Sequence, residues 1–387
     1  MAKNTSLKFL LLALFLVFPL GQLERLPIGT VGVGIYLHDF IIFLFTIIFA
    51  LGYHKDIHLT KTAKNIFPFV LIATTSFLIN IFRWGAQDSL LGLLYLIRWI
   101  VYFLFYICLS SLLNQKEWVK FLKKSIIYSI TISVFIGFTQ YFLYPDLRFL
   151  KYFGWDPHYF RLTGGWLDSG FSGMIYLLFF IYLYELFRGK FLKSKSLLLL
   201  AETYVAMALT YSRSSFLAFS TAGLIYSLKL KKLKYFLMAI MLLVATVWLL
   251  PRKSTVSTQL ERKDTIYARI ENWQNSLKIS ADSPILGVGF NNYKTAQERL
   301  IDGNTSPASH SASGADSSLL FVLATTGVLG LSAYLFYIYS IVSRNKASPL
   351  LLASTGALLV HSVFNNSLFY SWIMIWWWTI VALEEKN

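Results

Sequence analysis

The chain has 387 residues, of which 56% are hydrophobic and 14% are charged, with a formal net charge of +16. Soluble domains have about 45–50% apolar and about 25% charged residues, so this composition excludes a single water-soluble core. Apolar residues come in blocks of roughly 17 to 25, and each block is long enough to cross a hydrocarbon layer about 30 Å thick as a helix. The sequence therefore predicts an all-α, polytopic membrane protein.

The positive charge favours a membrane surface over a nucleic-acid partner. Lysines and arginines lie between the apolar blocks and form no single stripe, and the sequence has no recognised DNA- or RNA-binding motif. Basic loops that face anionic lipid explain the charge better. The only cysteine, Cys108, lies inside an apolar block, so no intramolecular disulfide can form. We expect membrane lipids as partners and no nucleic acid.

Twelve apolar blocks are candidate transmembrane helices. Their approximate bounds are residues 7–23, 33–53, 65–82, 89–113, 121–144, 170–187, 196–212, 213–228, 232–250, 316–342, 348–366 and 367–383. The first block follows Lys3 and Lys8 as in a signal peptide, but no small-residue cleavage site comes after it. We therefore expect a retained helix and about twelve spans.

The blocks divide the chain into three parts. Residues 1–250 are predicted to form an N-terminal bundle of about nine spans, residues 251–315 one large outer loop, and residues 316–387 about three further spans. A cytoplasmic N-terminus places more than half of the 35 lysines and arginines in cytoplasmic segments, as the positive-inside rule requires. Both termini are therefore predicted inside the cell, with residues 145–169 and 251–315 outside.

The large outer loop contains an amphipathic pattern. Apolar residues recur at i, i+4, i+7 and i+11, on Ile266, Ile270, Trp273 and Leu277. This spacing predicts an outer helix that lies on the membrane or on the helical bundle. Pro284, Gly287 and Gly289 then end the pattern and predict a turn.

The informative residues for chemistry are charged residues near the outer boundary, because the sequence has no nucleophile elbow, Walker loop, paired Cys-x-x-Cys or His-Glu-x-x-His. Arg213 lies within residues 210–215, at a tight connection between two apolar blocks. Its planar guanidinium suits bidentate phosphate binding, and the neighbouring hydroxyls can add donors. The alternative is a boundary arginine that reaches lipid phosphates.

Two further arginines lie in the outer segments. Arg269 precedes Ile270 and falls on or near the buried edge of the predicted outer helix, with an ordinary solvated position as the alternative. Arg161 lies in the other outer loop. Three arginines able to converge would make a site for a diphosphate.

His310 and Asp316 come just before the span that starts near residue 317. Either side chain could act as a general base on an acceptor hydroxyl, the histidine with an ordinary pKa near 6.5 and the aspartate already ionised at neutral pH. The alternatives are a solvent-exposed histidine and an aspartate that caps the following helix.

Four polar residues fall inside or at the end of predicted spans. Arg98 and Glu202 are predicted to form a buried structural pair, with a proton or ion relay as the alternative, because ionisable groups in hydrocarbon are rare and usually paired. His361 and Asn365 are four residues apart, so they share a helix face and are predicted to satisfy each other or bound water.

Four segments together resemble the O-antigen ligase and polymerase superfamily of bacterial inner-membrane glycan enzymes. They are Arg-Leu-Thr-Gly-Gly at 161–165, residues 210–214, residues 269–273 followed by 282–290, and residues 317–323 continuing into Gly-Val-Leu-Gly at 327–330. The resemblance covers roughly residues 155–340 and includes the layout of spans around one large outer loop. It implies a GT-C-like helical fold.

The resemblance implies an activity without metal or cofactor. A glycan would move from an undecaprenyl-diphosphate carrier to an acceptor, such as lipid A-core or another surface glycolipid, at the periplasmic face of the inner membrane. Arg213 and Arg269 would hold the diphosphate leaving group, with Arg161 as a third candidate.

The resemblance leaves the base open. In ligases of this superfamily a histidine just before the span with Gly-x-x-Gly activates the acceptor, whereas here Asp316 occupies that place and His310 lies six residues earlier. This departure weakens the ligase interpretation against a polymerase, which would use a second lipid-linked glycan as acceptor.

Two non-enzymatic alternatives complete the sequence analysis. A lipid-linked oligosaccharide transporter would show repeat symmetry and polar residues along a path through the membrane, whereas this chain gathers polar residues on one face. A non-catalytic scaffold would not explain an arginine at a tight outer turn and another on the loop helix.

Overall fold

The computed structural model describes residues 2–26, 34–53, 57–153, 155–188, 194–251, 258–260, 264–301, 314–344 and 348–385. The α-helices in this part of the chain are α1 (Ala2–Val17), α2 (Leu37–Tyr53), α3 (Lys61–Trp84), α4 (Ala86–Leu112), α5 (Lys116–Leu143), α6 (Ser169–Phe187), α7 (Ser194–Ala208), α8 (Arg213–Leu230), α9 (Lys234–Leu249), α10 (Asp264–Asp282), α11 (Tyr293–Leu300), α12 (Ser318–Arg344), α13 (Pro349–Phe364) and α14 (Ser371–Glu384). The shorter elements are 3-10 helices η1 (Phe18–Glu24), η3 (Arg148–Phe153), η4 (Gly164–Trp166) and η7 (Ser367–Phe369), and a two-stranded antiparallel pair, β1 (Arg25–Leu26) with β2 (Ile35–Tyr36).

Every predicted apolar block falls on one of these helices, and the chain is a polytopic helical membrane protein. Within the described residues, six helical segments are long and apolar enough to cross a membrane: Asn4–Glu24, Lys61–Trp84, Ala86–Leu112, Lys116–Leu143, Ser169–Phe187 and Ser318–Ser343. Helices α2, α9 and α13 are apolar but shorter. The number of twelve spans therefore stays a prediction.

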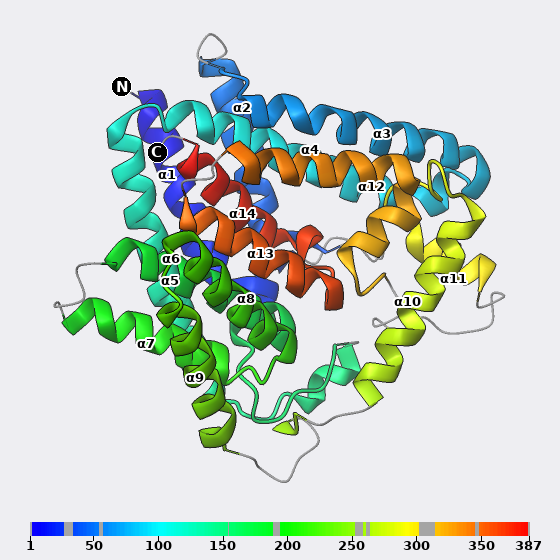
Figure 1. Cartoon of the computed structure of the whole chain (residues 1–387). Helices are drawn as coiled ribbons and strands as arrows, with labels where there is room; N and C mark the ends of the chain where they lie inside the picture. Colours follow the sequence, from blue (N-terminus) through cyan, green and yellow to red (C-terminus); the bar gives the residue numbers. More distant parts are fainter. Residues whose placement is uncertain are drawn as a thin grey trace.

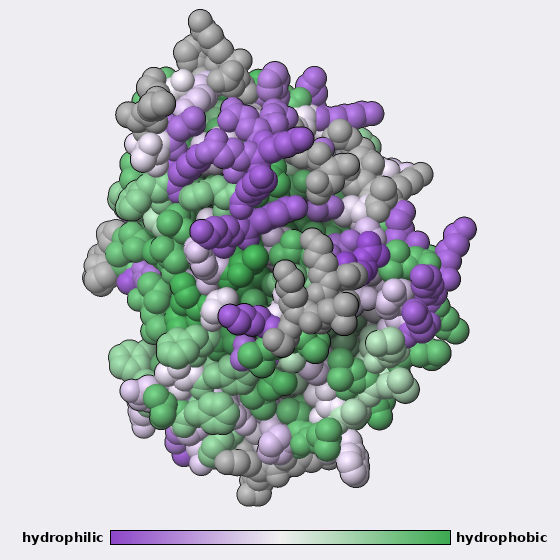
Figure 2. Space-filling view, turned by 90° about the vertical axis from the view of Figure 1, so that its left-hand side faces the viewer, coloured by the Kyte–Doolittle hydropathy of each residue, from purple (hydrophilic) through white to green (hydrophobic). Residues whose placement is uncertain are grey.

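The two chain termini lie at the same end of the molecule, far from α10 and α11 (Figure 1). Side-chain bonds join other segments to this end: Lys8 pairs with Glu117, and the Tyr106 hydroxyl donates to Glu385 over 2.6 Å. On this end of the molecule, hydrophilic side chains gather in one region beside a largely hydrophobic surface (Figure 2). The two chain ends and the connection between α4 and α5, which we predict to be cytoplasmic, thus lie together, although the side of the membrane that they face stays a prediction.

The opposite end joins the α3–α4 connection to α10 and the segment that follows it. Arg83 at the end of α3 pairs with Asp282 at the end of α10, with 2.6 Å between nitrogen and oxygen. The Trp84 indole donates to the carbonyl of Val288 over 2.7 Å. These bonds attach the segment that follows α10 to the helical bundle.

Helix α12 is kinked at Gly327, where the backbone leaves helical geometry with a φ of 66°. The segment after α10 supplies the hydrogen bonds that the kinked helix cannot make internally. These bonds are Val288 N to Ala324 O at 3.0 Å, Gly289 N to Thr325 O at 3.1 Å, and Val328 N to Pro284 O at 2.8 Å. Unpaired backbone groups are costly in an apolar environment, so these bonds stabilise the kinked helix. We call the predicted turn at residues 284–289 the clamp, because it holds the backbone of α12 at the kink.

Two glycines allow the clamp and the kink to approach each other. A Cβ added at Gly327 would lie 2.1 Å from the carbonyl oxygen of Ile285, and one added at Gly287 would lie 2.3 Å from the carbonyl carbon of Thr325. Gly287 also has a positive φ of 71°, which side chains rarely adopt. Both positions therefore exclude any other residue without a shift of the backbone.

The buried face of α10 differs from the predicted one. Ile266, Ile270 and Leu277 are 46%, 42% and 53% exposed, so the alternative that this apolar stripe packs on the bundle is wrong for three of its four residues. The inward stripe is mainly polar and consists of Arg269, Asn272, Trp273, Ser276, Ile279 and Ser280. Hydrogen bonds decide this face, because Asn272 Nδ2 donates to the carbonyl of Gly314 over 3.1 Å and Ser276 Oγ lies 2.8 Å from the Tyr293 hydroxyl. Contact of the apolar stripe with the membrane stays a prediction.

The predicted pair of Arg98 with Glu202 is wrong. Arg98 on α4 instead pairs with Asp39 at the start of α2, with 2.7 Å between nitrogen and oxygen. Glu202 lies half-buried on α7, a helix that packs against α6. Hydropathy locates both charges inside apolar helices, but the packing order of the helices decides which opposite charge each one meets.

Replacement of Gly327 by alanine should lower the melting temperature of the purified protein in detergent. The left-handed backbone alone costs a side chain about 1–3 kcal/mol, and the overlap with Ile285 adds to that cost. Gly85→Ala is the matched control, because Gly85 has a φ of 88° but nothing lies within 4 Å of an added Cβ. Equal losses in the two variants would contradict the clamp.

Candidate functional site

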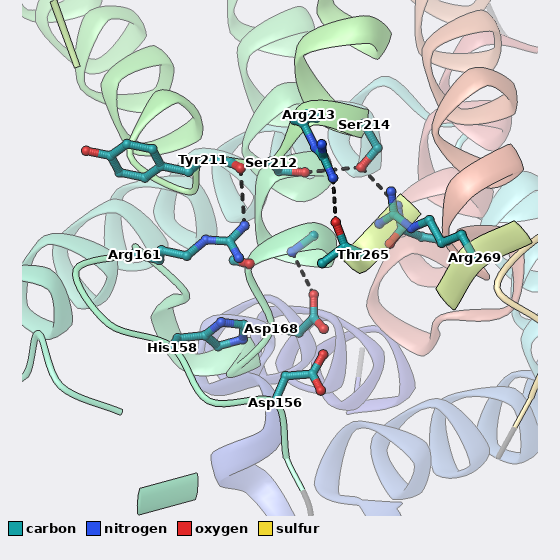
Figure 3. A pocket seen from close by; sticks show the side chains of 13 residues that line it. Asp156, His158, Arg161, Asp168, Tyr211, Ser212, Arg213, Ser214, Thr265 and Arg269 are labelled. Atoms are coloured by element: carbon teal, nitrogen blue, oxygen red, sulfur yellow. Dashed lines mark hydrogen bonds between the residues drawn. The ribbon is translucent and has the colours of Figure 1, made fainter. Parts of the chain in front are cut away.

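A pocket of about 140 Å³ lies where four segments of the chain meet. These segments are the connection before α6, the turn between α7 and α8, the start of α10 and the end of α13. The lining residues are Asp156, His158, Arg161, Asp168, Ser169, Gly170, Tyr211, Ser212, Arg213, Ser214, Thr265, Arg269 and Asn365 (Figure 3). All three sequence-predicted arginines are among them, so the structure brings them together.

Arg161 holds the turn between α7 and α8. Its side chain is buried, with Nε donating to the carbonyl of Thr210 over 2.8 Å and Nη2 donating to the carbonyl of Tyr211 over 3.2 Å. Tyr211 has a positive φ of 51°, which is uncommon for a bulky residue and allows the tight turn. Arg161 therefore stabilises the backbone that precedes Arg213.

Gln140 on α5 fixes the segment that carries Arg161. Its side-chain oxygen accepts hydrogen bonds from the amides of Thr163 at 2.8 Å and Gly164 at 3.2 Å. Its amide nitrogen donates to the carbonyl of Arg161 over 3.4 Å. One buried side chain thus satisfies backbone groups at the start of η4 and in the loop before it.

Arg213 is the first residue of α8, and its cap Ser212 accepts a hydrogen bond from the amide of Ser215. The Arg213 guanidinium donates to the carbonyl of Leu260 over 3.1 Å and to the Thr265 hydroxyl over 2.6 Å. It therefore connects the start of α8 to the start of α10. The positive end of the α8 dipole adds to the positive charge here.

Arg269 enters the pocket from α10 and lies near Ser214 and Thr265 in the close view (Figure 3). Its guanidinium lies 5.8 Å from the ring centre of Phe364. Burial lowers the pKa of Arg269, Asp316 opposes this shift, and the charge of Arg213 adds to it. The two arginines are thus close enough to interact, and an anion between them would relieve their repulsion.

Asn365 brings the end of α13 to the same pocket. Its Nδ2 donates to the Ser214 hydroxyl over 2.9 Å and lies 3.4 Å from His361 Nε2. The other ring nitrogen of His361 lies 2.6 Å from the Ser367 hydroxyl. The predicted contact between His361 and Asn365 is therefore present. Asn365 also lines the pocket, which the sequence did not predict.

Two carboxylates lie on the side of the pocket opposite Arg213 (Figure 3). Asp168 caps α6, where its Oδ1 accepts hydrogen bonds from the amides of Gly170 at 2.7 Å and Phe171 at 2.9 Å. Burial raises the pKa of Asp168, and the nearby Asp156 adds to this shift, whereas the amide hydrogen bonds and Arg161 lower it. The pocket therefore has a basic wall and an acidic wall.

The two carboxylates of the acidic wall, Asp156 and Asp168, were not predicted as site residues from the sequence. Asp168 stands before an apolar span, and this position is a recognisable helix-cap signal. Nothing in the local sequence of Asp156 or His158 indicates that they line the same pocket as Arg213. Their place in the pocket follows only from packing of the connection before α6 against the turn before α8.

The structure describes only one of the two predicted bases. His310 lies outside the described residues. Asp316 does not line the pocket but interacts with Arg269, and burial raises its pKa to about 6 although Arg269 lowers it. The predicted cap role of Asp316 is wrong, because α12 starts at Ser318 and the Ser317 hydroxyl accepts from the amide of Leu320. The catalytic role of either residue stays a prediction.

Comparison with known proteins gives one family. The model of the family described as O-antigen ligase matches residues 196–335, which include Arg213, Arg269 and Asp316 but not Arg161. No curated protein matches the chain. Among the described residues, no group of three or more His, Cys, Asp or Glu side chains is arranged to hold a metal ion.

Replacement of Arg161 by methionine should destabilise the protein strongly. Hydrogen bonds to charged groups contribute about 1.5–3 kcal/mol, and this change leaves the carbonyls of Thr210 and Tyr211 without a buried donor. Thermal unfolding in detergent measures the effect. Arg148→Met is the control, because Arg148 is exposed and bonds to the adjacent Asp146. If both variants unfold at the same temperature, Arg161 does not stabilise the turn.

Anion binding should depend on the protonation of Asp316. With a pKa of about 6, its carboxyl becomes neutral as the pH falls from about 7.5 to about 5, and one negative charge beside Arg269 is lost. Sulfate, whose charge is constant over this range, should bind roughly fivefold more tightly at the lower pH, as expected for about 1 kcal/mol of charge interaction. Titration calorimetry measures this, and Asp316→Asn should reduce the dependence. An unchanged dependence in that variant would assign it to another group.

Proposed function

We infer from the match of residues 196–335 to the family described as O-antigen ligase that this chain belongs to the O-antigen ligase superfamily and is a membrane enzyme that transfers glycans. We propose that the donor is a glycan on an undecaprenyl-diphosphate carrier and that the site faces the periplasm or the cell exterior. The acceptor is lipid A-core or another surface glycolipid. A polymerase with a lipid-linked acceptor is the alternative.

The observation that carries this proposal is the convergence of Arg161, Arg213 and Arg269 on one pocket. The first turns of α6 and α8 also line it. Helix N-termini and the guanidinium groups of arginines both bind phosphate groups well. A glycan-linked diphosphate carries two negative charges, so a pocket with this lining suits it better than a neutral ligand.

The arginines have different parts in this proposal. Arg213 and Arg269 hold the diphosphate and stabilise the charge that develops on it as the bond between the sugar and the phosphate breaks. Arg161 contributes its charge to the pocket, while its hydrogen bonds to Thr210 and Tyr211 hold the turn that places Arg213. No metal ion or cofactor takes part in this scheme.

The pocket's position suits a lipid-linked donor. The arginines lie on the segments that we predict to be outside, at residues 145–169 and 251–315 and at the turn before α8. Both chain termini lie at the other end of the molecule (Figure 1). We propose that the carrier's hydrocarbon chain stays in the outer leaflet of the inner membrane while its diphosphate enters the pocket.

Arg213→Ala and Arg269→Ala should each reduce transfer at least about 100-fold, because loss of one group that stabilises developing charge typically costs 10²–10³ in rate. Proteoliposomes with a radiolabelled undecaprenyl-diphosphate glycan and an acceptor lipid report the rate. Arg148→Ala, an exposed arginine of the same outer loop that does not line the pocket, should keep full activity. Full activity in either pocket variant would remove that arginine from the site.

The identity of the labelled product tests the type of enzyme. With extracted envelope lipids as acceptors, label on a non-polyprenyl lipid together with release of undecaprenyl diphosphate supports a ligase. Longer glycans that remain on the carrier support a polymerase. A donor that stays chemically unchanged with folded protein contradicts glycan transfer altogether.

A further inference from the structure

We propose that Asp168 is the general base that removes the proton from the acceptor hydroxyl. This inference rests on the proposed glycan transfer and adds a residue that neither the sequence analysis nor the family resemblance assigns. Its basis is the position of Asp168 in the pocket relative to the two arginines.

The pocket separates positive and negative side chains. Arg213 and Arg269 enter from the starts of α8 and α10, whereas Asp168 and Asp156 lie on the opposite side (Figure 3). In a direct displacement, the attacking oxygen approaches the sugar carbon from the face opposite the leaving group. If the diphosphate binds the arginines, the acceptor hydroxyl and its base lie on the side of the carboxylates.

Asp168 is held in place more firmly than its neighbour. Its Oδ1 accepts both amide hydrogen bonds at the start of α6, from Gly170 and Phe171. In the part of the chain that the structure describes, no donor binds Oδ2, which leaves this oxygen for a substrate hydroxyl. Asp156 is exposed and lies in a connection without regular structure. A fixed carboxylate suits proton transfer better, because the geometry of the transfer is set before the substrate binds.

The surroundings of Asp168 also suit a base. The charged and titratable groups that act on it or are coupled to it are Asp156, Arg161, Arg269 and Tyr370, and Asp316 interacts with it as well. Burial raises the pKa of Asp168 above its ordinary value. A carboxylate with a raised pKa accepts a proton more readily than one in water.

Asp316 has a different environment. It interacts most closely with Arg269 and does not line the pocket, which places it on the side of the leaving group. Its backbone amide donates to Asn272 Oδ1 over 2.8 Å, which attaches it to α10 beside that arginine. We therefore assign Asp316 as a counter-ion that adjusts the charge of Arg269.

The proposed step balances as follows. The acceptor hydroxyl gives its proton to Asp168 Oδ2, and its oxygen forms a bond to the anomeric carbon of the donor sugar. The bond from that carbon to the diphosphate oxygen breaks, and its electron pair leaves with the diphosphate. The products are the glycosylated acceptor, undecaprenyl diphosphate with one more negative charge beside Arg213 and Arg269, and a proton on Asp168 that passes to water.

The decisive variant is Asp168→Asn in the full-length protein in proteoliposomes. Asparagine keeps an Oδ1 that can accept both amide hydrogen bonds of the cap, but its amide cannot act as a base. We expect an unchanged melting temperature, binding of undecaprenyl diphosphate as tight as in the unaltered protein or tighter, and transfer reduced at least about 100-fold. Asp168→Ala, which also removes the cap, should lose thermal stability as well.

Asp146→Asn is the matched control, because Asp146 is an exposed carboxylate of the same loop that does not line the pocket, and it should keep full transfer. Asp156→Asn and Asp316→Asn test the two neighbouring carboxylates, and each should reduce transfer less than Asp168→Asn does. Near-normal transfer by Asp168→Asn would show that Asp168 is only a helix cap and would overturn the inference. Loss in Asp316→Asn alone would make Asp316 the base.

The same assay separates failure of this inference from failure of the proposed function. If the unaltered protein neither binds undecaprenyl diphosphate nor transfers the glycan, the donor proposal fails, and the assignment of Asp168 fails with it. If the unaltered protein binds and transfers, and Asp168→Asn does the same, only the base assignment is wrong.

Discussion

Backbone polar groups in apolar surroundings must find hydrogen-bond partners within the protein, and the structure depends on how two irregular points meet this requirement. At the α12 kink, residues 284–289 supply amides and a carbonyl to the helix around Gly327. At the turn before α8, the Arg161 guanidinium donates to the carbonyls of Thr210 and Tyr211. In both places a segment remote in sequence completes the backbone. These contacts also fix the segments that carry the pocket, because the clamp follows α10 directly and the turn leads into Arg213.

The pocket combines positive and negative side chains. Arg213 bonds to the start of α10, Asp168 bonds to the start of α6, and both side chains line the same cavity. A basic wall and an acidic wall thus face each other across a small volume. Such an arrangement suits a reaction in which negative charge moves to one side and a proton to the other.

Local sequence was a good guide where local chemistry decides the outcome. The tight connection at Arg213 and the helix at α10 were predicted correctly, because hydropathy breaks and helical spacing are properties of neighbouring residues. The alternative that the apolar stripe of α10 packs on the bundle was wrong, because Asn272 and Ser276 make the inward hydrogen bonds and Ile270 stays exposed. The partner of Arg98 was mispredicted because a buried charge pairs with whatever opposite charge packing brings to it, here Asp39.

The sequence by itself determined that this is a helical membrane protein, and it located three candidate arginines in the segments that connect its apolar blocks. Hydropathy and residue spacing are properties of the sequence, so they can be used without knowing how the helices pack. Only the tertiary structure decided that Arg161, Arg213 and Arg269 share one pocket and that Asp168 faces them. The segments that carry Arg161 and Arg269 are separated by the four helices α6 to α9 in the chain, and their distance in space depends on packing and on the hydrogen bonds that complete each irregular backbone.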